Sequence, residues 1–293
     1  HTAEFLLTTE GRAAADELTS AAPAELADER LPPLLDRLRR RFTPEQAGAL
    51  VTLARLRRRA AAKFPQAERM FFTAEALEQA TAWDVAATHA ARLDQHAPPG
   101  SLLDLGCGIG GDLLALAQRR PVVAYELDPV RARFAQANTE ALGLGDRVEV
   151  RARDWVADLQ SGLLPAAGGA FADPARRNEE RRTFRLAQMQ PPLAALLALQ
   201  AVIPALGVKV MPGVADAELP PECSVEFISH AGVCKEAVLW FGPTRWERKW
   251  AALLPKGETA GVGGALTLPG DQEGDSPPLG PLAAGQVLYE PDC

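Results

Sequence analysis

The chain has 293 residues, of which 47% are hydrophobic and 24% are charged, and its formal net charge is −7 at pH 7. This length can hold one α/β domain with a smaller appendage, and the hydrophobic content excludes an intrinsically disordered protein. The acidic balance excludes a uniformly basic nucleic-acid binder.

Residues 2–97 are rich in Ala, Leu and Arg and carry helical periodicity with little strand signal. Each predicted helix opens on Pro, Thr or a small polar residue. The predicted helices are residues 13–18, 32–41, 44–63 and 74–93. A Pro-Pro-Gly sequence at residues 98–100 then marks a boundary. We therefore expect a helical domain over residues 1–97, followed by a sheet domain.

The most informative segment is a short apolar strand pattern that ends in Asp104 and runs directly into a glycine-rich turn. The turn contains Gly106, Gly108, Gly110 and Gly111. A Leu/Ala-rich helix is predicted over residues 112–118. Glycines let the backbone approach a ligand and adopt positive φ, and a helix N-terminus presents free N–H groups. The pattern predicts a nucleotide-type ligand at the carboxyl end of a parallel strand.

Asp104 discriminates between two classes of ligand. Gly106, Gly108 and Gly111 satisfy the spacing of a dinucleotide fingerprint, which keeps a nicotinamide dinucleotide as an alternative. A carboxylate beside the pyrophosphate of that ligand would be repelled. The same carboxylate attracts the ammonium and sulfonium groups of S-adenosylmethionine. Asp104 therefore favours the methyl donor as the cofactor.

Two further predicted strands also end in acidic residues. Residues 121–125 form a buried strand pattern followed by Glu126, at the spacing from the glycine turn where a βαβ unit places a ribose-binding acid. Residues 148–152 form a third strand that leads to Asp154 and Trp155. Their side chains suit an adenine amino group and the face of an adenine ring. The alternatives are a helix-capping role for Glu126, a turn role for Asp154 and a core position for Trp155.

Residues 169–177 give a fourth predicted strand that ends in Asp173 and Pro174, for which an ordinary strand-ending turn is the alternative. Later strands are expected at residues 207–211, 224–228 and 237–241, the last two antiparallel, with one more at 249–254. The expected fold is an α/β domain over residues 98–256 with a Rossmann-like, mostly parallel sheet and an antiparallel last strand. Residues 257–280 are rich in Gly and Pro, so we expect a linker and the start of a truncated C-terminal domain over 257–293.

Over residues 97–243 the chain resembles the class I S-adenosylmethionine-dependent methyltransferases. Residues 104–111 match the first motif of that family, Glu126 its ribose acid, and Asp154 with Trp155 its adenine contact. Within the class it is similar to the trimethylguanosine-synthase-like RNA methyltransferases and to bacterial proteins with a THUMP-like C-terminal domain. The sequence Phe-Thr-Ala-Glu at residues 72–75 and the Asp-Pro pair carry that narrower resemblance.

The resemblance implies a set of cofactor-binding and catalytic residues. The N-terminal segment containing Phe72 and Thr73 is expected to fold over the cofactor. The implied cofactor contacts are Phe72, Thr73, Asp104, Gly106, Cys107, Gly108, Gly110, Gly111, Asp112, Glu126, Leu127, Asp154 and Trp155. Asp173 and Pro174 are the implied catalytic residues, since a carboxylate and a proline carbonyl accept hydrogen bonds from a substrate amine. Ala175 and Arg176 replace the second proline and aromatic ring of the family pattern, so the stacking platform is missing.

Clusters of arginine favour RNA as the substrate. They occur at residues 37–41, at 55–59 and at 176–185, and a basic cleft binds phosphates with strongly salt-dependent affinity. We expect Arg55, Arg58, Arg176 and Arg177 to bind the substrate. Nothing in the sequence resembles a module that reads a DNA groove. Helix faces on which arginine pairs with Glu and Asp are the alternative explanation.

The resulting hypothesis is a methyltransferase that acts on a base amine of RNA. One alternative is a methyltransferase for a small molecule or a protein, with the helical domain as a lid. The other is a non-catalytic RNA-binding module with a methyltransferase-like fold. The cysteines at positions 107, 223, 234 and 293 lack metal-ligand spacing, and no apolar run is long enough for a bilayer. We therefore expect no metal, no membrane role and a cytoplasmic location.

Overall fold

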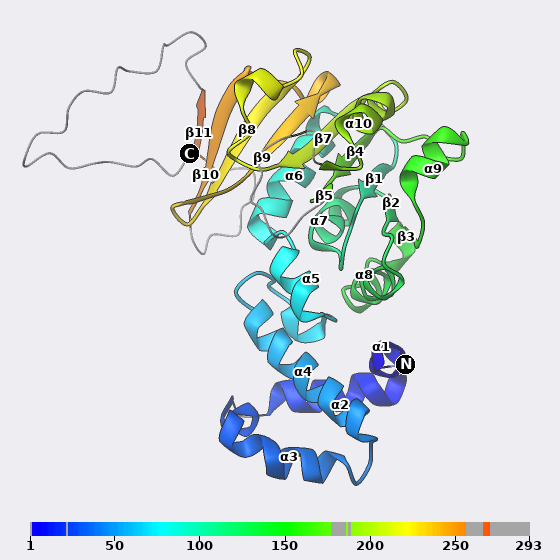
Figure 1. Ribbon diagram of the computed structural model, residues 1–293, viewed down its shortest axis with the longest axis vertical. Coiled ribbons are helices and arrows are strands. Elements are labelled where there is room, and N and C mark those ends of the chain that lie inside the picture. The colour runs from blue at the N-terminus through cyan, green and yellow to red at the C-terminus, as the bar shows by residue number, and fades with distance from the viewer. Residues whose placement is uncertain (1, 22, 177–185, 187–188, 256–265, 270–293) are drawn as a thin grey trace, which may run out of the picture. The chain divides into compact units, whose positions relative to one another are not determined.

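A computed structural model describes residues 2–21, 23–176, 186, 189–255 and 266–269 (Figure 1). The chain divides into two compact units, and each unit is built from two separate stretches of sequence. Unit 1 consists of His1–Ala86 and Cys107–Asp154, and unit 2 consists of Ala87–Gly106 and Trp155–Cys293. The glycine-rich turn therefore begins in unit 2 at Gly106 and continues in unit 1 from Cys107.

Unit 1 is mainly helical and includes one pair of parallel strands. Its α-helices are α1 (Thr2–Leu7), α2 (Thr9–Ser20), α3 (Leu31–Leu38), α4 (Pro44–Ala60), α5 (Ala74–Gln79), α7 (Gly111–Arg119) and α8 (Pro129–Ala141). Its strands are β2 (Val122–Tyr125) and β3 (Val148–Arg151). Short 3-10 helices are η1 (Pro23–Leu26), η2 (Asp28–Arg30), η3 (Ala67–Arg69) and η4 (Gly145–Arg147).

Side-chain caps begin several helices of unit 1. The Thr43 hydroxyl accepts from the backbone N–H of Gln46, and the Gln46 side chain accepts from the backbone N–H of Thr43, which forms a capping box for α4. At α2 the Thr8 hydroxyl forms a single capping bond by accepting from the backbone N–H of Gly11. Such caps satisfy backbone donors that have no partner inside the helix.

One hydrophobic core holds unit 1 together. It joins buried side chains of residues 6–77 to Ile109 and Leu114 in and after the glycine turn, and to Phe134 and Ala137 of α8. The buried Asn138 side chain adds a polar link, because its oxygen accepts from Phe71 N (2.7 Å) and its nitrogen donates to Ile109 O (2.8 Å). That nitrogen also donates to Phe71 O (3.2 Å). The N-terminal helices thus share their core with α7 and α8.

Unit 2 contains most of the sheet. Its α-helices are α9 (Trp155–Gln160), α10 (Leu193–Gln200) and most of α6 (Trp83–His96). Its strands are β1 (Leu102–Leu105), β4 (Gly169–Ala172), β5 (Ala175–Arg176), β6 (Met189–Gln190), β7 (Ala205–Val210), β8 (Ser224–His230), β9 (Val233–Phe241), β10 (Lys249–Leu254) and β11 (Leu266–Pro269). The 3-10 helices are η6 (Asp216–Glu218) and η7 (Gly242–Thr244).

The strands of unit 2 follow the order β11-β10-β8-β9-β7-β4-β1, with β5 and β6 in a small separate sheet. Strands β1, β4 and β7 are parallel, and their register places Asp104 opposite Phe171 and Leu105 opposite Ala172. Strand β9 then runs antiparallel to both β7 and β8. This arrangement confirms the predicted α/β sheet with an antiparallel last strand, and it brings the ends of β1 and β4 side by side.

Two local predictions were wrong. A single helix was expected over residues 74–93, but α5 ends at Gln79 and α6 begins at Trp83, with Ala80 in an extended conformation. The break lets the Thr81 hydroxyl donate to the buried Asp112 carboxylate at 2.7 Å. Strand β11 lies inside the stretch expected to be a linker, where it pairs with β10. The expected start of a C-terminal domain near residues 287–291 lies outside the described residues.

Within the described part of the chain, no helix combines the length and the apolar character that a membrane span requires.

Candidate functional site

The glycine-rich turn follows β1 and reverses the chain through positive backbone φ angles. These are +95° at Gly106, +56° at Gly108 and +103° at Gly110, after which α7 begins at Gly111. The Cys107 N–H donates to Tyr125 O at 3.0 Å, and the Gly110 N–H donates to Cys107 O at 2.8 Å. The turn is thereby fixed at the end of β2, with its glycines in conformations that other residues rarely adopt.

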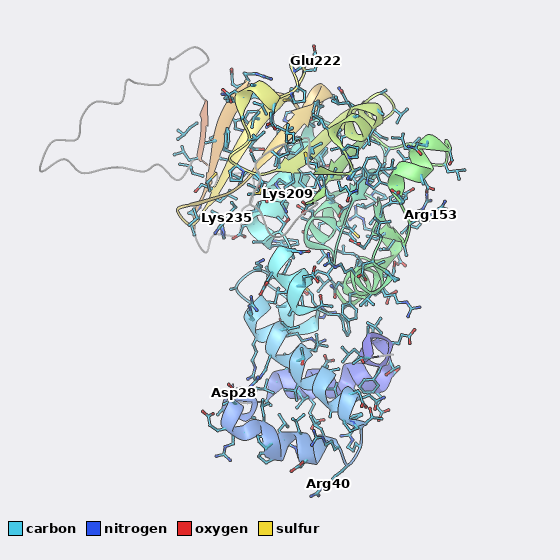
Figure 2. All side chains as sticks on the ribbon, viewed as in Figure 1. Asp28, Arg40, Arg153, Lys209, Glu222 and Lys235 are labelled. Atoms are coloured by element: carbon cyan, nitrogen blue, oxygen red, sulfur yellow. The ribbon has the colours of Figure 1, made fainter. Side chains whose placement is uncertain are left out.

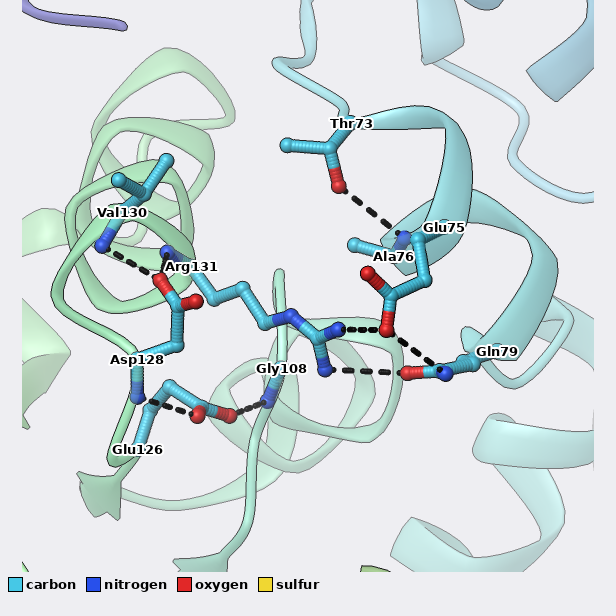
Figure 3. A network of polar contacts seen from close by, with 9 residues as sticks. All are labelled: Thr73, Glu75, Ala76, Gln79, Gly108, Glu126, Asp128, Val130 and Arg131. Atoms are coloured by element: carbon cyan, nitrogen blue, oxygen red, sulfur yellow. Dashed lines mark hydrogen bonds and ion pairs between the residues drawn. The ribbon is translucent and has the colours of Figure 1, made fainter. Parts of the chain in front are cut away.

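Glu126 is the side chain that fixes the middle of the turn (Figure 3). One carboxylate oxygen accepts from the Gly108 N–H at 2.9 Å, and the other accepts from the Asp128 N–H at 2.8 Å. Asp128 in turn caps α8 by accepting from the N–H groups of Val130 and Arg131. Beside Gly108 the space is open, since a Cβ added there would meet no atom within 4 Å. A ligand could therefore approach this backbone closely.

The segment with Phe72 and Thr73 is held next to the start of α8. Phe72 is buried against Phe64, with ring centroids 5.9 Å apart, and the Thr73 hydroxyl caps α5. The Arg131 guanidinium donates to Glu75 at 2.6 Å and to Gln79 at 3.0 Å, which ties α8 to α5 (Figure 3). The segment is thus anchored on the same helix that follows Glu126.

The remaining predicted cofactor contacts of unit 1 differ in their exposure. Cys107 is buried, as is Asp112, whose carboxylate accepts the hydrogen bond from Thr81. Leu127 is 70% exposed, an unusual state for a large apolar side chain directly after Glu126. Asp154 is exposed at the end of the unit. Leu127 and Asp154 are therefore accessible to a ligand, whereas Asp112 has a structural hydrogen bond.

In unit 2 the ends of β1 and β4 meet at Gly106. Asp104 is a buried carboxylate on β1, and Trp155 is buried at the start of α9. The Asp173 N–H donates to Leu105 O at 3.1 Å. A Cβ on Gly106 would lie only 2.9 Å from the Asp173 carbonyl oxygen, so glycine is required for this approach. Asp173 thus lies at the carboxyl end of β4, directly beside the first glycine of the turn.

The Asp173 carboxylate belongs to a group of charged side chains that sequence reasoning missed. Its Oδ2 accepts from Lys209 Nζ of β7 at 2.8 Å. Lys209 is labelled in Figure 2. The same ammonium lies 3.7 Å from the Glu236 carboxylate of β9, and the other Glu236 oxygen lies 2.7 Å from His89 Nε2 of α6. The available sequence signal for this group was a lysine within the apolar pattern of residues 205–210. Its partners are remote in sequence, so the pattern alone did not identify them.

The structure describes the second predicted catalytic residue, Pro174, and some of the predicted substrate-binding residues. Pro174 is half-buried, and the backbone of Arg176 pairs with Met189 between β5 and β6. Arg177 lies outside the described residues, as do Arg181, Arg182 and Arg185.

The guanidinium groups of Arg55 and Arg58 have partners within the N-terminal helical segment. Arg55 donates to Leu26 O and to Asp28, and Arg58 donates to Ala21 O. The neighbouring Arg57 is buried and donates to Met70 O and Asp16. These contacts stabilise the packing of α4, and RNA binding by Arg55 and Arg58 stays a prediction.

The carboxylates of this site suit a ligand with cationic and hydroxyl groups. A buried carboxylate favours a positive partner, and the oxygens of Glu126 retain lone pairs for hydroxyl donors. In the described part of the chain, no cluster of three or more His, Cys, Asp and Glu side chains is arranged to hold a metal ion.

Comparison with known proteins adds four findings. A family model described as a domain of unknown function (DUF8688) matches residues 1–60. An uncharacterized S-adenosylmethionine-dependent methyltransferase of Mycobacterium tuberculosis, found in strains CDC 1551 and H37Rv, is 35% identical over 270 residues, which is 87% of this chain and 68% of that protein. An uncharacterized RNA methyltransferase of Parasynechococcus marenigrum is 37% identical over 101 residues, or 34% of this chain and 22% of that protein.

A solved structure from Porphyromonas gingivalis W83, of a protein assigned as a methyltransferase, superposes with a TM-score of 0.64 at 17% identity. The match covers 88% of this chain, and the chain spans 64% of that structure. At this identity the likeness concerns the fold alone.

Proposed function

The chain belongs to the S-adenosylmethionine-dependent methyltransferases, and from this premise we propose that it methylates an exocyclic amine of an RNA base. It is an enzyme of class I, and its cofactor is S-adenosylmethionine. Within the class, we propose a relationship to the trimethylguanosine-synthase-like and THUMP-like groups. A cytoplasmic location and the three-part domain division also stay predictions.

We propose that two carboxylates recognise two polar parts of the cofactor, its amino-acid ammonium and its ribose hydroxyls. Asp104 is buried at the end of β1, where its negative charge suits the ammonium of the amino-acid part. Glu126 accepts two backbone hydrogen bonds, and each of its oxygens keeps a further lone pair for a ribose hydroxyl. Both residues therefore have chemistry that fits this cofactor.

The adenine and the backbone contacts complete the proposal for the cofactor. The exposed side chain of Leu127 offers an apolar surface to the ring, and the Asp154 carboxylate can accept from its amino group. The turn glycines, Gly106, Gly108, Gly110 and Gly111, leave the backbone accessible. Phe72, Thr73, Cys107, Asp112 and Trp155 are proposed to shape the site, since they are buried or used as helix caps and internal partners.

The observation that carries the proposed chemistry is the Asp173 carboxylate at the end of β4. When bound, the cofactor supplies an electrophilic methyl group on a sulfonium, so the protein's main task is to align the nucleophile. The Asp173 side chain is 33% exposed and is held in place by Lys209. A carboxylate in this place, with the adjoining Pro174 carbonyl, can accept hydrogen bonds from an amine and direct its lone pair.

RNA is the substrate class that we favour. One relative, from Parasynechococcus marenigrum, is named an RNA methyltransferase, and exocyclic amines of bases suit an acceptor such as Asp173. Arg55 and Arg58 make internal contacts, so we propose that Arg176 and Arg177 contribute more to phosphate binding. Arginine in this role gives an affinity that falls steeply with salt.

The experiment that tests this function follows labelled methyl into separate fractions. The purified chain would be incubated with S-adenosylmethionine carrying a tritiated methyl group and with total RNA, total protein or small metabolites from cells that lack the gene. We expect label in RNA, and nucleoside mass spectrometry should show an N-methylated base. Asp173→Ala should lower the rate of transfer by at least about 100-fold, while Asp146→Ala, at an exposed acid of η4, should leave it intact.

The other outcomes separate the competing functions. Label only in the protein or metabolite fraction would replace RNA by that substrate class. Cofactor binding without transfer to any fraction would support a non-catalytic module, and normal transfer by Asp173→Ala would remove Asp173 from the chemistry.

A further inference from the structure

Lys209 is a lysine in a strand whose other residues are almost all buried. Val208 and Val210 flank it on β7, and the Lys209 side chain itself is only 17% exposed. Removal of an ammonium from water is costly unless acidic partners compensate for it. The compensation here comes from two carboxylates, one directly after the neighbouring strand β4 and one on the neighbouring strand β9.

The contacts of Lys209 continue into the interior of unit 2. Its ammonium donates to Asp173 at 2.8 Å and lies 3.7 Å from Glu236, whose side chain is 7% exposed. Glu236 lies 2.7 Å from His89, and the His89 ring stacks on Phe171 with centroids 4.4 Å apart. Phe171 belongs to β4, two residues before Asp173. The series of contacts therefore ends on β4, the strand that leads directly into Asp173.

This series of contacts restrains a side chain that would otherwise rotate. An aspartate at the end of a strand has freedom at both of its side-chain torsions. A charge-assisted bond to Oδ2 selects one orientation, and Glu236 compensates the ammonium so that Lys209 itself stays in place. An acceptor that orients a substrate amine needs this restraint, because a misplacement of about 1 Å can cost about 100-fold in rate.

We propose that Lys209 is a positioning residue for methyl transfer, acting through Asp173 and held by Glu236 and His89. The inference rests on the proposed function, since it takes Asp173 as the group that touches the substrate amine. Lys209 itself need not touch the cofactor or the substrate.

The test compares Lys209→Met with Lys235→Met. Lys235 is the matched control because it is an exposed lysine on β9, directly before Glu236 (Figure 2). We expect Lys209→Met to lower kcat by about 10- to 100-fold, with the KM and Kd for S-adenosylmethionine within about twofold of the unchanged chain. Lys235→Met should match the unchanged chain. A parallel loss of cofactor binding, or a kcat within twofold, would overturn the inference.

A double-mutant cycle tests whether Lys209 acts through Asp173. Once Asp173→Ala has removed the acceptor, the added change Lys209→Met should alter the residual rate by less than about twofold. A further loss close to that of the single variant would mean that Lys209 acts on its own, which would overturn the proposal.

A spectroscopic measurement keeps the inference separate from the choice of substrate. With 15N-labelled lysine, the Lys209 Nζ resonance should shift in Asp173→Ala and stay unchanged in Lys235→Met. If wild-type label enters protein or metabolites, the RNA proposal fails and the kinetic comparison is made on that fraction. With label in no fraction the proposed function fails, and an unshifted Nζ resonance would then overturn the Lys209–Asp173 contact itself.

Discussion

Replacing Gly108 by alanine should weaken cofactor binding without creating a clash inside the fold. The added methyl group meets no protein atom within 4 Å, so it creates no clash inside the chain. The backbone φ of +56° lies in the left-handed region, where a residue with a Cβ pays roughly 1–2 kcal/mol. Alanine has less conformational freedom than glycine in the unfolded chain, and this stabilises the folded protein by about 0.4–1 kcal/mol. The net loss of folding free energy should be about 1 kcal/mol.

Gly143→Ala is the matched control for this variant. Gly143 follows α8 with φ of +74° and likewise has no atom within 4 Å of an added Cβ. The two variants should therefore unfold at similar urea concentrations. Only the methyl group of Gly108→Ala enters the space that we propose for the cofactor.

Calorimetric titration with S-adenosylmethionine measures the difference between the two variants. We expect Gly108→Ala to bind at least about tenfold more weakly than Gly143→Ala, which corresponds to about 1.4 kcal/mol. Equal affinities, within twofold, would refute the reasoning, because they would mean that no ligand occupies the open space beside this turn.

Three more predictions follow from single residues. Asp104→Asn keeps the shape of a buried side chain but removes its charge, so titration should show more than about a tenfold loss of affinity for S-adenosylmethionine; unchanged affinity would remove Asp104 from the site. Gly242→Ala would place a Cβ 1.9 Å from Pro204 O at a φ of +66°, so urea unfolding should show a loss of at least about 3 kcal/mol, and a loss below about 1 kcal/mol would contradict the packing. Burial raises the pKa of the Cys223 thiol, which lowers its thiolate fraction, so at pH 8 iodoacetamide should modify Cys223 more slowly than the less buried Cys234, as peptide mass spectrometry can measure. Equal rates would contradict that burial.

The parts of the fold that were predictable depend on short-range patterns. The strand that ends at Leu105 and the turn that begins at Gly106 are visible because apolar runs, acids and glycines follow one another within a few residues. The same is true of β2 with Glu126 and of β4 with Asp173. The mixed α/β sheet could therefore be predicted from the sequence.

The parts that were not predictable depend on partners far away in the chain. The break between α5 and α6 has no Gly or Pro to signal it, and its Thr81 hydroxyl binds Asp112, which lies beyond β1. The arginines of α4 looked like a basic surface because their acceptors, such as Asp16 and Asp28, belong to other helical segments. The role of Lys209 likewise required the neighbouring strands.

The Asn138 amide has a consequence for how this protein can change over evolutionary time. One side chain in the last turn of α8 bonds both backbone groups of Phe71 and the carbonyl of Ile109. If recombination replaced the N-terminal helices as one segment, the new segment would need the same backbone N–H and carbonyl beside the Asn138 amide. Otherwise buried polar atoms would be left without partners. The N-terminal helices and the glycine turn are therefore expected to be inherited together. We expect a substitution at Asn138 only together with changes around both Phe71 and Ile109.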